Sequence, residues 1–151
     1  MISTLSGTIA SIGVDSCVVE LGGIGLHVNL TPRHILKLKT GEKTSIATRL
    51  VVREDELSLF GFQSSQERDQ FDLLCSVSGI GPKLAMTTLA GMDATGLANA
   101  VNNQDEVAFR AIPGIGPKTA KLILISLGGK VGPHQHGPRD GPPYSGGPQG
   151  R

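Results

Sequence analysis

The stretch Ser78-Gly79-Ile80-Gly81-Pro82-Lys83-Leu84-Ala85 returns, with few changes, as Pro113-Gly114-Ile115-Gly116-Pro117-Lys118-Thr119-Ala120. The second copy lies 35 residues after the first. A phrase repeated at such a distance indicates two copies of one supersecondary unit. In each copy a Gly-Ile-Gly turn is followed by a proline, which suits the first position of a helix, and then by an amphipathic run. The sequence therefore predicts a helix, a hairpin and a helix, twice.

Each predicted hairpin has the features of an anion site. Glycine adopts positive φ without strain and lets another backbone come close, while the free amides at a helix N-terminus attract an anion. Lys83 and Lys118 stand at matching offsets and add a cation to each copy. An ordinary tight turn between helices would explain one copy but not two copies that share a lysine. We therefore interpret both hairpins as phosphate-binding.

The Gly-rich phrase that ends in Lys118-Thr119 is not a nucleotide-binding P-loop. That motif needs glycine where this chain has Ile112 and Pro117, and it follows a strand, whereas the residues before this phrase have a helical pattern. The sequence therefore predicts no ATP site.

Composition limits the classes of function. The 151 residues carry 14 Lys and Arg against 13 Asp and Glu, so the bulk positive field typical of nucleic-acid binders is missing and any such charge must be arranged locally. No apolar run is long enough to span a bilayer, and the first residues do not resemble a signal peptide, which predicts a cytoplasmic protein. Cys17 and Cys75 have neither metal-site nor disulfide-scaffold spacing and are expected to be small core residues.

The fold class expected is α+β. Residues 1–62 alternate as strands do, with candidates at 8–12, 17–21, 26–30, 45–52 and 57–62, which predicts a five-stranded OB-like β-barrel. Gly22-Gly23 suits a tight turn, and residues 31–41 form a longer connection with room for a helical turn.

Residues 63–127 are predicted to form an all-helical tandem helix-hairpin-helix domain of about five helices. Ser64, Asp93 and Asn103 are the expected helix caps. Residues 128–151 are so rich in glycine and proline that a disordered tail is expected.

The remaining polar candidates have ordinary interpretations when taken alone. Glu54 and Asp55 lie between two apolar strands, as expected of a solvated hairpin tip. His27 is expected on a strand surface and His34 in a polar connection. No nucleophile with its base and no metal-ligand cluster emerges. The sequence predicts no catalytic residue, no metal site and no cofactor.

The barrel pattern, the paired hairpins and the phrases Val51-Val52-Arg53-Glu54-Asp55 and Leu59-Phe60-Gly61-Phe62 together resemble the RuvA family. These proteins are the Holliday junction-binding subunits of the bacterial RuvAB branch-migration complex, which acts in recombination and repair. The resemblance covers residues 1 to about 125. It implies a homotetramer, or an octamer of two tetramers, that binds four-way junction DNA by shape and presents it to the RuvB ATPase motor.

The resemblance also assigns roles to residues. The two hairpins would grip the sugar-phosphate backbone of the junction arms, and the acidic pair Glu54 and Asp55 would form a pin near the centre of the tetramer. Carboxylates among converging phosphates repel duplex and so favour strand separation. The grips comprise Gly79, Ile80, Gly81, Lys83, Gly114, Ile115, Gly116, Lys118 and Thr119.

Three alternatives stay open. The family continues into a third helical domain that contacts RuvB, and residues 128–151 do not resemble it, which suggests a truncation or a shifted reading frame. The chain could then act only in assembly, covering junctions without a motor. It could instead be a general DNA-repair adaptor with no junction preference. A glycosylase or nuclease is the third alternative, but it would need a catalytic Asp or Lys beside the second hairpin, or a metal cluster, and the sequence shows neither.

Overall fold

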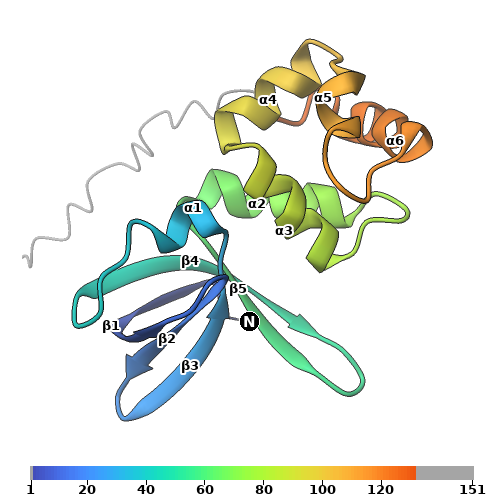
Figure 1. Ribbon diagram of the computed structural model, residues 1–151. Coiled ribbons are helices and arrows are strands. Elements are labelled where there is room, and N and C mark those ends of the chain that lie inside the picture. Colours follow the sequence, from blue (N-terminus) through green and yellow to red (C-terminus); the bar gives the residue numbers. More distant parts are fainter. Residues whose placement is uncertain (1, 132–151) are drawn as a thin grey trace, which may run out of the picture.

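The computed structural model describes residues 2–131 and consists of a barrel followed by a group of helices (Figure 1). The barrel strands are β1 (Thr4–Ile12), β2 (Ser16–Leu21), β3 (Ile24–Asn29), β4 (Lys43–Val52) and β5 (Leu57–Phe62). They close in the order β1-β2-β3-β5-β4. All pairs are antiparallel except β3 with β5. The predicted five-stranded OB-like barrel is confirmed.

Two connections in the barrel follow the sequence predictions. Gly22 and Gly23 have φ of +59° and +85° and join β2 to β3 in a tight turn, with Leu21 paired to Ile24. The connection between β3 and β4 contains the short helix α1 (Pro32–Ile35), whose N-cap Thr31 accepts a hydrogen bond from the His34 amide. Both connections therefore have the structure that the sequence predicts.

The helical part contains α2 (Ser65–Cys75), α3 (Pro82–Gly91), α4 (Ala94–Asn102), α5 (Glu106–Arg110) and α6 (Pro117–Leu127). Ser64 caps α2 by accepting from the Glu67 amide at 3.2 Å, and Asp93 caps α4 by accepting from the Gly96 amide at 2.7 Å. Both caps are as predicted, and so are the helical hairpins.

The prediction that Asn103 is the N-cap of a helix is wrong, because Asn103 is instead the C-cap of α4. Asn103 follows the end of α4, Gln104 adopts a positive φ of 51°, and Asp105 accepts from the Ala108 amide to cap α5. Five consecutive polar residues, 102–106, stand here, and after the backbone turn at Gln104 it is Asp105 that caps the next helix.

The predicted start of the disordered tail, at residue 128, is too early in the chain. Lys130 donates its amide to Leu127 O at 3.0 Å after a turn at Gly129, and Val131 is buried in the helical core with 4% of its surface exposed. The packed part of the chain therefore reaches Val131. The rest of the tail, residues 132–151, lies outside the described residues.

Two apolar cores meet where β5 ends. The barrel is filled by buried apolar side chains, among them Leu5, Ile9, Val19, Val28 and Ile46. Phe62, the last residue of β5, belongs instead to the helical core and packs against Phe71 of α2, with ring centroids 5.0 Å apart.

Polar contacts also join the barrel to the helices. Arg49 of β4 forms a bidentate ion pair with Asp72 of α2. Arg68 of α2 donates to Ser3 O at 2.7 Å. The helices are thereby held against the barrel at several points. Within residues 2–131 no helix is long and apolar enough to cross a membrane.

Candidate nucleic-acid interface

The first hairpin joins α2 to α3. Gly79 has φ of +88°, and the Ile80 amide donates to Val77 O at 3.1 Å, which closes the turn. Gly81 is extended and precedes Pro82, the first residue of α3. A side chain at Gly79 would be strained in this conformation, so the glycine is required by the backbone.

The second hairpin repeats this geometry between α5 and α6. Gly114 has φ of +94°, the Ile115 amide donates to Ile112 O at 3.1 Å, and Gly116 precedes Pro117 at the start of α6. The repeat seen in the sequence is therefore a repeat of backbone structure.

The isoleucines of the two hairpins do not face outward. Ile80 and Ile115 are 4% and 5% exposed and belong to the helical core. Their amides are also taken by the turns. The assignment of these two residues to the DNA grips needs correction. Their side chains pack into the helical core and are not available to a ligand.

The exposed residues of each hairpin include its glycines and its lysine. Neither Gly81 nor Gly116 supplies a side chain to cap its helix, so the first amides of α3 and α6 lack both an intrahelical partner and a side-chain cap. Lys83 and Lys118 lie in these first turns and are exposed, and Thr119 is half-buried. Each hairpin thus combines free amides with one cation, which suits a phosphate.

The two hairpins and the β4–β5 turn are neighbours in space. A Cβ added to Gly114 would lie 2.9 Å from Leu84 Cδ1, which places the second hairpin against the start of α3. A Cβ added to Gly81 would lie 3.9 Å from Arg53 Nη2, which places the β4–β5 turn beside the first hairpin. The three loops therefore form one continuous surface.

Glu54 and Asp55 form the tip of the β4–β5 turn and are exposed. The Arg53 amide donates to Glu56 O at 2.8 Å and closes the turn. The acidic pair therefore lies at the end of the two strands β4 and β5, and the neighbouring Arg53 lies beside the first hairpin.

The barrel and the hairpin domain each match a known family model. Residues 1–61 match "RuvA N terminal domain", and residues 71–128 match "SAM-like Helix-hairpin-helix tandem". Proteins named "Holliday junction branch migration complex subunit RuvA" are similar over most of the chain. The relative from Arthrobacter sp. (strain FB24) is 49% identical over 91% of this chain and 64% of its own length. That from Streptomyces coelicolor is 43% identical over 96% of this chain and 72% of its own length.

The chain belongs to the RuvA family. It spans 61 to 64% of the length of the Arthrobacter and Clavibacter michiganensis relatives, the latter being 48% identical to it.

Groups with a perturbed pKa lie away from the hairpins. Burial, with a smaller contribution from Lys37, lowers the pKa of His34 to about 4. Burial raises the pKa of Glu67, and burial followed by the charge of Asp72 raises the pKa of Cys75 to about 11. His34 was expected in a polar connection, but α1 turns it toward the interior, where it is 7% exposed. His27 is exposed on β3, as predicted.

No group of three or more His, Cys, Asp or Glu residues that could hold a metal ion occurs among residues 2–131. Sequence reasoning missed the position of Arg53 beside the first hairpin. Its only signal was a basic residue directly before the acidic pair, and nothing in the sequence relates that turn to Gly81, 28 positions later.

Proposed function

We propose that this chain binds four-way DNA junctions as a homotetramer and presents them to the RuvB ATPase motor for branch migration. The observation that supports this best is the continuous surface of two hairpins with the same backbone geometry beside the acidic β4–β5 turn, in a member of the RuvA family. The chain itself would act as a noncatalytic DNA-binding subunit.

The hairpins would bind the phosphate backbone of a junction arm. Their free amides and the lysines Lys83 and Lys118 recognise phosphate oxygens and make no distinction between bases. Because the two hairpins are adjacent, one subunit would contact two nearby points on the same arm. Four copies would supply one such pair to each of four arms, so the symmetry of a tetramer would match that of the junction. Two tetramers facing each other across the DNA would give an octamer.

The acidic turn would provide discrimination. Glu54 and Asp55 project beside the basic surface and would repel the phosphates of a duplex that runs straight across it. A junction opened at its centre leaves space for the acidic turns between its arms, whereas continuous duplex does not. The carboxylates would therefore weaken binding to linear DNA more than binding to a junction.

A salt-titrated binding comparison of a four-way junction with linear duplex of equal length tests the proposal. The slope of log K against log salt is negative, and Lys83→Gln and Lys118→Gln should each reduce its magnitude by about 0.9 for each phosphate that the variant no longer neutralises. Lys39→Gln, an exposed lysine of the connection between β3 and β4, is the matched control and should leave the slope unchanged.

The double variant Glu54→Gln and Asp55→Asn should bind linear duplex severalfold more tightly and the junction with little change. Equal affinity of the unaltered chain for junction and duplex would refute the proposal and favour a repair adaptor with no junction preference. Unchanged duplex affinity in the double variant would refute the role of the acidic turn alone.

A further inference from the structure

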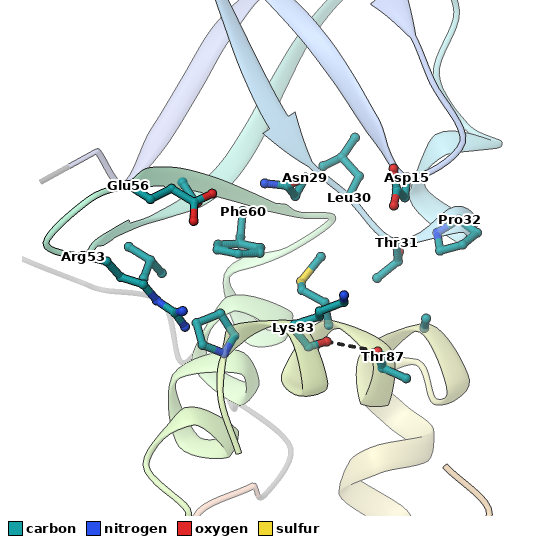
Figure 2. A pocket seen from close by; sticks show the side chains of 15 residues that line it. Asp15, Asn29, Leu30, Thr31, Pro32, Arg53, Glu56, Phe60, Lys83 and Thr87 are labelled. Carbon is teal, nitrogen blue, oxygen red and sulfur yellow. Dashed lines mark hydrogen bonds between the residues drawn. The ribbon is translucent and has the colours of Figure 1, made fainter. Parts of the chain in front are cut away.

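A cavity of about 540 Å³ lies between the barrel and α3. Its barrel wall comes from the end of β3, the start of α1 and the β4–β5 hairpin, and its helical wall is one face of α3 (Figure 2). Lys83 of the first hairpin and Arg53 of the acidic turn both line it. The cavity therefore opens between the two loops that would contact a junction, and it has the volume of a small-ligand pocket.

The floor of the cavity is apolar. Leu30 is buried, and Phe60, Met86 and Ala90 are half-buried. Phe60 packs against Phe71 with ring centroids 5.3 Å apart, which fixes the position of its ring. Figure 2 shows the Phe60 ring on the barrel side of the space, across from Lys83 on α3. Such a floor suits a flat aromatic group.

The rim is charged and balanced. Arg53 and Lys83 supply two cations, Asp15 and Glu56 supply two carboxylates, and all four residues line the cavity and are exposed. Glu56 Oε1 accepts a hydrogen bond from the Ser58 hydroxyl at 3.0 Å. One phosphate would bind at the cations. The two carboxylates would repel any second phosphate. The carboxylates instead accept hydrogen bonds from N–H groups.

From this arrangement we propose that the cavity binds one unpaired nucleobase of a strand that leaves a junction arm, with the adjoining phosphate on Lys83. The inference rests on the proposed function, because it assumes that the first hairpin holds the arm. A paired base is excluded from the cavity, since its edge is already hydrogen-bonded and its partner adds bulk. The site would therefore favour strands that have separated at the crossover.

Junctions with one extra unpaired thymidine at each crossover test this site. The comparison molecule carries an abasic tetrahydrofuran residue at the same positions, so that base pairing is the same in both. Stacking of one base on an aromatic side chain contributes about 1–3 kcal/mol. The thymidine junction should therefore bind at least about fivefold more tightly than the abasic junction.

Filling the cavity should abolish this difference. Ser58→Trp fills it from the barrel wall and Thr87→Trp from the helical wall, and both residues line it. In each variant the affinity ratio should fall close to one. His27→Trp, which adds the same side chain at an exposed strand position outside the cavity, should keep the full ratio. Circular dichroism shows whether each variant is folded.

A ratio near one in the unaltered chain, or a full ratio in both filled variants, would overturn the inference. The proposed function fails separately, if an unmodified junction binds no more tightly than linear duplex. A chain that prefers junctions but ignores the extra base would keep the proposed function and lose this site.

Discussion

The contact between Arg33 and the end of α3 gives a prediction about how the hairpin surface is held. Arg33 lies in α1 on the barrel and donates from Nη1 to Leu89 O at 3.1 Å and from Nη2 to Ala90 O at 3.0 Å. These carbonyls belong to the last turn of α3, where the helix dipole favours a cation. The first hairpin lies at the other end of the same helix, about 15 Å away for ten residues. Arg33 therefore fixes the far end of the helix that carries the hairpin.

We expect Arg33→Met to lower the free energy of unfolding by about 3 kcal/mol. Hydrogen bonds from a charged donor contribute about 1.5–3 kcal/mol each, and the lower end applies because the Arg33 side chain is half-buried. The interaction with the helix dipole adds about 0.3–1 kcal/mol, and methionine keeps part of the apolar packing. Arg33→Lys retains the charge but not the planar pair of donors, so it should recover less than half of the loss.

Urea denaturation measures the loss, and hydrogen exchange locates it. The amides of the last turn of α3 should exchange faster in Arg33→Met, while those of α6 should not change. Arg110→Met is the control, because Arg110 is exposed at the end of α5, on a different helix from the one that Arg33 contacts. A loss below about 0.5 kcal/mol, or a uniform change in exchange, would refute the argument that Arg33 holds this helix end.

Two further predictions concern backbone strain and pH. Gly79→Ala and Gly114→Ala should each lower the free energy of unfolding by about 1 kcal/mol, since both glycines have positive φ. Gly114→Ala should cost slightly more because Leu84 must move. A neutral effect of either change in urea denaturation would contradict this prediction. Because folding lowers the pKa of His34 from 6.5 to about 4, its contribution to stability is present above pH 6.5 and is lost as the pH falls toward 4. The unaltered chain should lose up to about 3 kcal/mol over this range relative to His34→Gln, and parallel pH profiles of the two proteins would contradict the assignment; Glu67, whose pKa is raised, contributes equally to both.

The barrel, the hairpins and two of the helix caps could be predicted because their signals are local. Alternating apolar residues mark the strands, and Gly22-Gly23 marks one turn through its backbone requirement. The duplicated phrase marks both hairpins. In each case the residues that carry the signal are within a few positions of the structure they determine.

The features that could not be predicted depend on distant contacts. Ile80 and Ile115 stand between glycines, and only the packed helices show that they point into the core. Arg33 and Leu89 are 56 residues apart, and no periodicity relates them. Val131 lies within a Gly/Pro-rich stretch, yet the backbone turns at Gly129 and Val131 packs in the helical core. Tertiary packing decides these positions, so single-sequence patterns miss them.

The near-neutral charge of the chain, which by itself argues against DNA binding, is consistent with recognition of shape. A net charge of +1 keeps the nonspecific attraction to any DNA weak, because that attraction grows with the number of phosphates a protein neutralises. On the proposed function, binding would depend on the few places where cations and free amides coincide, at Lys83 and Lys118, and the carboxylates of Glu54 and Asp55 would disfavour unbroken duplex. On the proposed function, a more basic chain would bind all DNA more tightly and would discriminate less between a junction and a linear duplex.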